Sequence, residues 1–266
     1  MFHDFARRAP GRTILQAVWW DFIAMFCGVL AKLFYRMNVV GAHNIPRTGG
    51  VLLVGNHQSF LDPIPHAAVA YDRQTAYIAR STLFNNKYFG ALISSFNAIP
   101  LKEKSDSAAI KTALQVLAQG RCLLIYPEGG RCDDGAIAPF QRGVALLIRR
   151  AKVPVVPIGL EGGFDIWPSS RKWPRLGGRL EVEAGQAFDP EVLMNDPDGG
   201  IERLRLAVDR LRMNRRESIR RATQGRFPAN GPGDQLLVPA TESESVRAAQ
   251  SPATSSHSTS STNAHA

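Results

Sequence analysis

The stretch VLLVGNHQSFLDP, residues 51–63, decides the fold because it has the pattern of a strand, a turn and the start of a helix. Residues 51–55 form a continuous apolar run that ends in glycine, which is typical of a strand covered on both faces. Pro63 favours the first turn of a helix, and Asp62 favours the position that caps one. A strand, a turn and a helix in direct succession predict an α/β domain.

The same alternation continues to about residue 221. Short apolar runs and amphipathic patterns predict further strands at 76–79, 98–101, 122–127, 153–160 and 179–185, and helices at 105–120, 140–151 and 199–221. Strands that alternate with helices predict a mostly parallel central sheet flanked by helices. We therefore assign residues 39–224 to one α/β domain.

An apolar segment, residues 1–38, precedes this domain. Its most apolar part, residues 13–35, is interrupted by Gln16, Asp21 and Lys32. A charged side chain in the middle of a bilayer costs roughly 2.5–3.5 kcal/mol, so a helix that lies in the membrane interface fits better than one that spans. A buried first helix of the domain and a signal peptide remain alternatives, although no small-residue cleavage site follows the run.

The other end of the chain, residues 225–266, loses apolar periodicity and becomes rich in Ser, Thr and Ala. Such a segment buries too little apolar surface to offset the entropy of ordering it. We therefore predict a disordered C-terminal tail.

Charge points to an anionic partner. The chain of 266 residues has a formal net charge of +9, and residues 201–226 hold nine arginines against three acidic residues. Nucleic acid, anionic lipid and a solvated basic face are all compatible with this segment. Because it lacks interleaved aromatic residues and a known nucleic-acid-binding module, we expect an anionic membrane surface and no nucleic acid.

Three cysteines without metal-ligand spacing favour a reducing, cytoplasmic setting.

His57 and Asp62 follow the carboxyl end of a predicted strand, where open α/β sheets bind their ligands. On a continuous helix a separation of five residues would point the two side chains about 140° apart, so only a turn can bring them together. A carboxylate bonded to one imidazole nitrogen leaves the other nitrogen available as a base. Spacing alone leaves open the alternative that Asp62 is a plain helix cap and His57 an ordinary loop histidine.

A second polar turn, YPEGGRCDDG at residues 126–135, follows another apolar strand. Gly129 and Gly130 allow a ligand to approach the backbone closely. Arg131 offers a planar fork that suits a phosphate. By itself, however, a glycine turn that carries an arginine is often only a turn.

Together the two turns resemble the lysophospholipid acyltransferase family, whose bacterial type enzyme acylates 1-acylglycerol 3-phosphate. NHQSFLD (56–62) is similar to the family's first motif, a histidine followed by four residues and an aspartate. YPEGGR (126–131) is similar to the third motif, usually FPEGTR. FQRG (140–143) and VPVVPIGL (153–160) follow in the family's order, and the resemblance covers about residues 30–215.

The resemblance implies a membrane-associated acyltransferase at the cytoplasmic face of the cell membrane. His57 would be the general base that deprotonates the acceptor hydroxyl, and Asp62 would orient it. The hydroxyl would attack the thioester of acyl-CoA or acyl-carrier protein directly, giving phosphatidic acid. Arg131 would hold the acceptor's phosphate in a pocket shaped by Glu128 and Gly129. No cofactor or metal is expected.

Two motifs depart from the family's pattern. The third has Gly130 in place of the usual Thr and Cys132 in place of the usual Ser. The second motif usually ends in an arginine, and the corresponding stretch here is IPLKEK (99–104), with Glu103 at the arginine position. Lys102 and Lys104 could supply charge for the phosphate, but not the fork geometry of a guanidinium. A different lysolipid acceptor, such as an acylated amino-acid lipid, therefore stays an alternative, as does a non-catalytic protein that binds anionic membranes.

Overall fold

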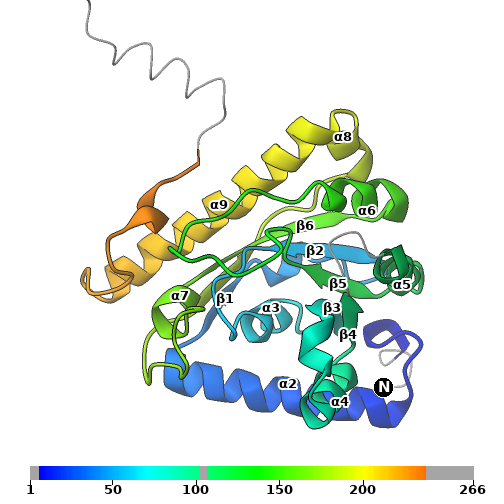
Figure 1. Cartoon of the computed structure of the whole chain (residues 1–266), viewed down its shortest axis with the longest axis horizontal. Coiled ribbons are helices and arrows are strands. Elements are labelled where there is room, and N and C mark those ends of the chain that lie inside the picture. Colours follow the sequence, from blue (N-terminus) through cyan, green and yellow to red (C-terminus); the bar gives the residue numbers. More distant parts are fainter. Residues whose placement is uncertain (1–5, 102–106, 238–266) are drawn as a thin grey trace, which may run out of the picture. The chain divides into compact units, whose positions relative to one another are not determined.

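The computed structural model describes residues 6–101 and 107–237. Its centre is a seven-stranded sheet in the order β1-β7-β6-β2-β5-β3-β4 (Figure 1). The strands are β1 (Asn38–Val40), β2 (Val51–Gly55), β3 (Thr75–Arg80), β4 (Ala98–Leu101), β5 (Cys122–Ile125), β6 (Val155–Glu161) and β7 (Glu181–Ala184). All neighbouring strands are parallel except β6 and β7, which are antiparallel.

The α/β fold predicted from the sequence is confirmed. All six predicted strands are present, with ends that differ from the prediction by at most two residues. Every residue of β2 is buried, as its continuous apolar run indicates. The short strand β1 was not predicted, because three residues are too few to show a period.

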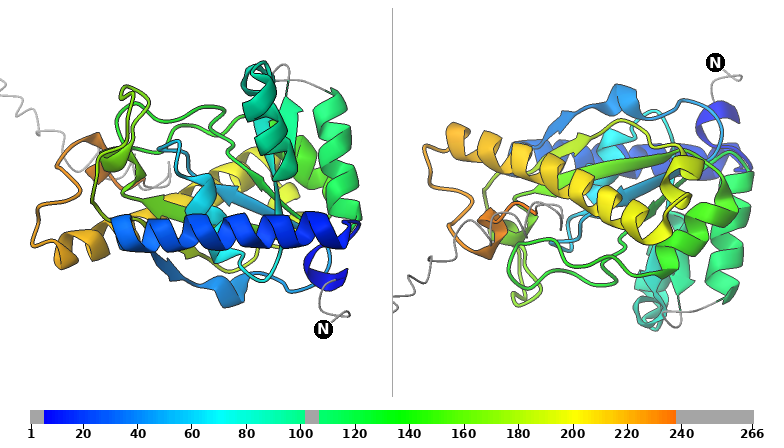
Figure 2. Two further views of the ribbon diagram at one scale, coloured as in Figure 1. Left: turned by 90° about the horizontal axis from the view of Figure 1, so that it is seen from below. Right: turned by 90° about the horizontal axis from the view of Figure 1, so that it is seen from above.

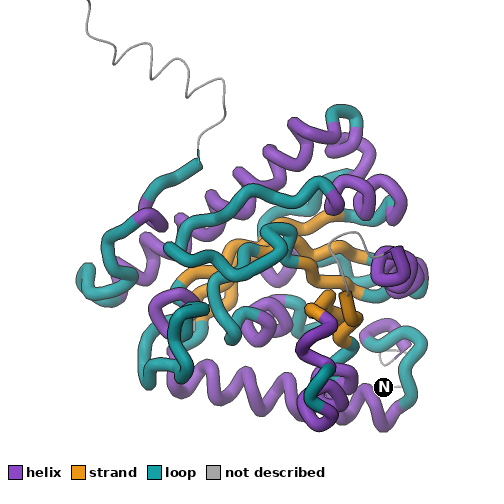
Figure 3. The backbone as a smooth tube through the Cα atoms, in the orientation of Figure 1, coloured by secondary structure: helices purple, strands orange, loops and turns teal. Residues whose placement is uncertain are grey.

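Helices cover both faces of the sheet (Figure 2), and the strands lie between them (Figure 3). On one face α9 (Pro197–Ala222) lies along β6, with α6 (Gly143–Ala151) and α8 (Pro190–Met194) beside it and α5 (Ser107–Ala118) next to α6. On the other face α3 (Pro63–Val69) packs against the sheet, and α2 (Ile14–Tyr35) packs on α3. The short helices α4 (Lys87–Ser95) and α7 (Gly163–Ile166) lie in the connections after β3 and β6.

The contact between α9 and β6 is close enough to require a glycine. A Cβ atom on Gly159 would come within 2.2 Å of the backbone nitrogen of Arg212. Any larger residue would push the helix away from the strand, because the obstructing atoms belong to the backbone. Gly159 therefore allows the arginines of α9 to reach the end of β6.

Most of the apolar surface of α2 is exposed. Its buried residues are Ala17, Trp20 and Ala31. Its large exposed apolar residues are Ile14, Leu15, Val18, Trp19, Phe22, Met25, Phe26, Val29, Leu33 and Phe34. Among the described residues α2 is the one helix long and apolar enough to cross a membrane, by length and composition alone. The alternative of a buried first helix does not match this exposure.

One of the two charged residues that interrupt the apolar run of α2, Asp21, contacts the domain. The Asp21 carboxylate accepts hydrogen bonds from Arg8 at 3.2 Å and from Gln74 at 3.1 Å. A capping box formed by Thr13 and Gln16 fixes the start of the helix. Asp21 is therefore paired with the domain, whereas Lys32, in the last turn of α2, is exposed.

The prediction of a disordered tail from residue 225 differs from the structure over residues 225–237. Asp234 accepts a hydrogen bond from Arg216 Nε at 2.7 Å, and the Ala229 carbonyl accepts one from Arg216 Nη2 at 2.7 Å. This segment is held by ion pairs and backbone acceptors, which apolar periodicity does not report. The rest of the predicted tail, residues 238–266, lies outside the described residues.

Candidate active site

Two neighbouring strands bring the two polar turns to the same edge of the sheet. β2 and β5 are parallel and pair in register, with Val54 opposite Ile125. His57 follows the end of β2 by two residues, and the second turn begins directly after β5. Because parallel strands end at one edge, the two turns lie side by side there.

His57 and Asp62 form a direct hydrogen-bonded pair. The distance between His57 Nδ1 and Asp62 Oδ2 is 2.7 Å, and Asp62 is fully buried. The same oxygen accepts hydrogen bonds from the backbone N–H groups of Gln58 at 2.6 Å and Ser59 at 2.8 Å. Asp62 stands at the cap position of α3, yet its side chain makes no capping hydrogen bond. The alternative of a plain helix cap is therefore wrong.

This pairing sets the state of the imidazole. Asp62 Oδ2 acts only as an acceptor here, so the proton of a neutral His57 ring lies on Nδ1 and the lone pair lies on Nε2. The side chain is 21% exposed, and none of the described residues hydrogen-bonds to Nε2. The geometry presents Nε2 as a base to a group that approaches from outside.

Glu128 ties the backbone of His57 to the second turn. One of its carboxylate oxygens accepts from the His57 N–H at 2.6 Å, and the other accepts from the Ala138 N–H at 2.8 Å. The Cys132 N–H donates to the His57 carbonyl at 2.8 Å. Glu128 is 8% exposed, and burial raises its pKa to about 7 in spite of the two N–H donors, which lower it. Glu128 thus fixes the backbone of His57 relative to the second turn.

An aromatic pair supports the imidazole from behind. The Tyr126 ring stacks on His57 with the ring centroids 4.1 Å apart and an angle of 12° between the planes. His66 packs edge-on against Tyr126, and its Nδ1 lies 2.7 Å from the Asp62 carbonyl oxygen. Burial lowers the pKa of His66 to about 4, so this ring is neutral at neutral pH. The sequence analysis missed both residues. Tyr126 is signalled only by its place in the third motif, and His66 by nothing local.

Two guanidinium groups lie on the glycine turn. Arg131 Cζ lies 3.5 Å from the centroid of the Phe60 ring, and its buried Nη1 has no hydrogen-bond partner among the described residues. Burial lowers the pKa of Arg131. Arg80, the last residue of β3, donates from Nη2 to the Gly129 carbonyl at 3.1 Å. Arg80 was not predicted, although its position at the carboxyl end of a parallel strand could have indicated it.

The other predicted residues are placed as follows. Gly129 adopts a left-handed backbone conformation with φ of 75°, which explains the need for glycine in this turn. A Cβ atom on Gly130 would lie 3.3 Å from Arg80 Nη2. Lys102 and Lys104 lie outside the described residues. Their contribution to the site stays a prediction.

Comparison with known proteins confirms the resemblance seen in the two turns. Residues 36–161 match the family model described as Acyltransferase. A protein of Bacillus subtilis named 1-acyl-sn-glycerol-3-phosphate acyltransferase is 27% identical over 168 residues, which cover 63% of this chain and 81% of that protein. Chloroplast proteins of the same name from Arabidopsis thaliana and Brassica napus are each 30% identical over 56% and 51% of this chain.

The chain spans about two fifths of the length of the two plant proteins, 42% and 40%. Among solved structures, the crystal structure of the 1-acyl-sn-glycerophosphate acyltransferase PlsC from Thermotoga maritima superposes with a TM-score of 0.59. The match covers 86% of this chain and 88% of that chain, at 23% sequence identity. At this identity the likeness is one of fold.

Glu128 is expected to make stability depend on pH. Between its ordinary pKa of 4.5 and about 7, the native state keeps a proton on Glu128 that the unfolded chain has lost, so stability falls as the pH rises through this window. The displacement corresponds to roughly 3 kcal/mol. In urea titrations, the free energy of unfolding of the wild type relative to Glu128→Gln should decline by up to that amount between about pH 5 and about pH 8. A difference between the wild type and Glu128→Gln that does not change with pH would contradict the expectation.

Proposed function

We propose, on the premise that residues 36–161 belong to the acyltransferase family, that this protein moves a fatty acyl group from a thioester to the free hydroxyl of a lysophospholipid. The proposed acceptor is 1-acylglycerol 3-phosphate, and the product is phosphatidic acid. The observation that carries the proposal is the His57–Asp62 pair, whose imidazole keeps Nε2 open beside a turn with two guanidinium groups. The proposed donor is an acyl thioester of CoA or of an acyl-carrier protein.

His57 supplies the base in the proposed reaction. Nε2 takes the proton of the acceptor hydroxyl as its oxygen attacks the thioester carbonyl carbon. The new ester C–O bond forms, the C–S bond breaks, and the imidazolium returns the proton to the departing thiolate sulfur. Asp62 holds the ring and stabilises its charged form through the 2.7 Å contact. A thioester is already activated, so positioning and one base suffice without a cofactor.

The glycine turn supplies the proposed phosphate site. Arg131 presents a buried Nη1 that has no partner among the described residues, while Phe60 covers the face of its guanidinium. Arg80 adds a second guanidinium on the same turn. Forked guanidinium groups bind phosphate in two-point contacts. Arg80 thus provides the fork geometry that Lys102 and Lys104 cannot, and the two lysines would add charge.

The proposed membrane contact is formed by α2 and α4. The indole Nε1 of Trp19 in α2 donates to Ser95 Oγ at the end of α4, at 3.0 Å. α4 also exposes large apolar side chains, namely Tyr88, Phe89 and Leu92. Exposed apolar residues of both helices, with tryptophan among them, suit a protein that lies in the membrane interface.

The three cysteines are free, which supports a reducing compartment and the cytoplasmic face of the cell membrane.

Replacing His57 tests the reaction. His57→Ala should lower kcat by about 10²–10⁴-fold because it removes the base, and the variant should remain folded at the assay temperature. The measurement is separation of lipids after incubation with acyl-CoA and 1-acylglycerol 3-phosphate. The matched control His43→Ala, at an exposed histidine outside the site, should keep wild-type activity. Undiminished transfer by His57→Ala would end the assignment.

Replacing the two arginines tests the acceptor. Arg131→Lys and Arg80→Lys keep the charge and lose the fork, so each should raise the KM for 1-acylglycerol 3-phosphate by about tenfold. The KM for a phosphate-free monoacylglycerol should not change, and Arg150→Lys on α6 should affect neither substrate. Equal effects on both acceptors would show that the arginines do not bind the phosphate, and would favour a different lysolipid.

Replacing exposed residues of α2 tests the membrane contact. The double variant with Phe22→Asp and Phe26→Asp should lose at least about tenfold in binding to vesicles that contain phosphatidylglycerol, because it places charges in the apolar surface. Cosedimentation with the vesicles measures the binding. The control Val192→Asp changes an equally exposed apolar residue on α8 and should bind as the wild type does. Unchanged binding of the double variant would exclude α2 as the contact.

A further inference from the structure

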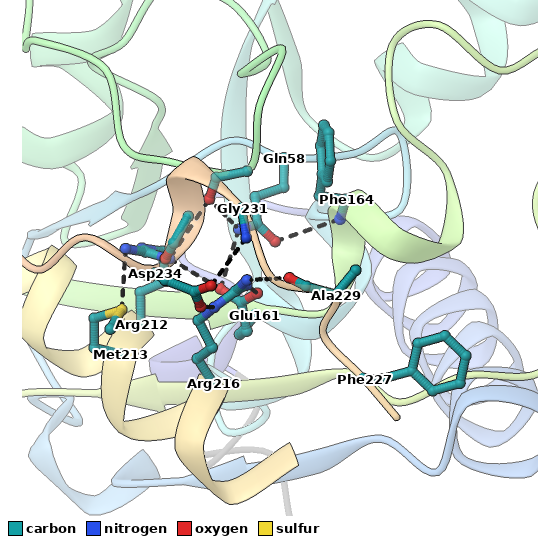
Figure 4. A network of polar contacts seen from close by, with 12 residues as sticks. Gln58, Glu161, Phe164, Arg212, Met213, Arg216, Phe227, Ala229, Gly231 and Asp234 are labelled. Atoms are coloured by element: carbon teal, nitrogen blue, oxygen red, sulfur yellow. Dashed lines mark hydrogen bonds and ion pairs between the residues drawn. The ribbon is translucent and has the colours of Figure 1, made fainter. Parts of the chain in front are cut away.

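We propose that residues 226–234, here called the C-terminal strap, position residues 56–62, here called the catalytic loop. In this proposal Asp234 acts on His57 through a buried ion network and Gln58. The proposal rests on the proposed function for the reaction that the loop performs. Figure 4 shows the network between the strap and Gln58.

Gln58 is the point where the network meets the catalytic loop. It follows His57 directly, and its backbone N–H donates to Asp62 Oδ2 at 2.6 Å. Its side chain is 1% exposed and donates from Nε2 to Glu161 and to the Gly135 carbonyl, at 3.2 Å each. Its Oε1 accepts from the Phe164 N–H at 3.4 Å. The amide therefore fixes the residue on which the Asp62 contact depends.

Glu161, at the end of β6, connects Gln58 to α9. Its carboxylate is fully buried and accepts from Arg216 Nη1 at 2.5 Å and from Arg212 Nη1 at 3.3 Å. Arg212 also donates from Nε to buried Asp209 at 2.8 Å. Two carboxylates thus face two guanidinium groups away from water. A buried network of this kind is stable only while each charge keeps its partners, because an unpaired buried charge is costly.

The strap supplies partners that complete this network. The Gly233 carbonyl accepts from Arg212 Nη1 at 2.8 Å, and the Ala229 carbonyl accepts from Arg216 Nη2 at 2.7 Å. The Asp234 carboxylate pairs with Arg216 at 2.7 Å and with Arg220 at 2.6 Å.

The strap also packs directly against Gly135 of the second turn, which is a hydrogen-bond partner of Gln58. A Cβ atom on Gly233 would lie 3.1 Å from the Gly135 carbonyl oxygen, the atom to which Gln58 donates.

Loss of the Asp234 carboxylate would therefore change the position of the His57 imidazole. Arg216 would keep Glu161 and lose its second carboxylate, so the short contact that fixes Glu161 would rearrange. Glu161 is an acceptor for Gln58, and the Gln58 N–H is one of the donors that hold Asp62. A small displacement of a catalytic group is enough to lower the rate of the chemical step. Asp234 is thus a positioning residue, which contacts neither substrate nor His57.

The test compares variants of the full chain at a temperature where all are folded. Asp234→Ala should lower kcat about tenfold with little change in the KM for the acceptor, and Asp234→Glu should restore most of the rate. Glu217→Ala, which removes the exposed ion pair with Arg221 on the same helix, should keep the wild-type kcat. If Asp234→Ala does not fold, Asp234→Asn removes the charge at nearly constant size. An unchanged kcat in the folded variant would overturn the proposal.

A double-mutant cycle tests the route. If Asp234 acts through Gln58, the double variant with Gln58→Ala and Asp234→Ala should be no slower than Gln58→Ala alone. Additive losses would overturn the route.

A second readout does not depend on activity. The proton on His57 Nδ1 should give a downfield NMR resonance in the wild type and in Glu217→Ala, and this resonance should broaden or vanish in Asp234→Ala. If the resonance persists in Asp234→Ala, the proposed positioning role of the strap is wrong, whether or not the protein acylates a lysolipid. Absence of transfer by the wild type would reject the proposed function alone.

Discussion

The buried carboxylate of Asp62 is the constraint on which the site depends. A carboxylate without exposed surface must be satisfied by donors inside the protein. Asp62 Oδ2 is hydrogen-bonded to His57 Nδ1 and accepts from the backbone N–H groups of Gln58 and Ser59, while Oδ1 is buried without a partner among the described residues. These donors come from the five residues that precede Asp62. The turn between β2 and α3 must therefore bend so that its backbone N–H groups and the His57 ring point at the Asp62 carboxylate. The position of the imidazole follows from this requirement.

Glu128 does for the second turn what Asp62 does for the first. Its two oxygens accept backbone N–H groups from His57 and Ala138, and so it joins the turns that follow β2 and β5. Glu161, at the end of β6 on the other side of β2, joins the catalytic loop to α9 by accepting from the side chains of Gln58 and Arg216. Three buried carboxylates near the carboxyl ends of β6, β2 and β5 thus connect the loops that form the site, together with the stacking of His57 on Tyr126. The apolar core fixes the sheet, and these acceptors fix the site.

The sequence predicted the parts of this arrangement that local pattern determines. Apolar runs located β2 and β5, and Pro63 located the start of α3. The succession of strand, turn and helix made a pairing of His57 with Asp62 possible, and the resemblance to the acyltransferase motifs favoured it over a plain helix cap. Partners from distant segments could not be predicted in this way, because the stacking of Tyr126 on His57 and the placement of Arg80 on the glycine turn depend on strand order. The strap was missed because its ion pairs leave no period in the sequence.

The adjacency of β2 and β5 has a consequence for regiochemistry. Neighbouring strands lie about 4.8 Å apart, so the loop that carries the imidazole and the turn that carries Arg131 start from points one strand spacing apart. In the proposed reaction, an acceptor whose anion is held by the guanidinium groups would therefore be bound next to the loop that carries His57 Nε2. The parallel pairing of β2 with β5 would then favour transfer to a hydroxyl that lies near that anion.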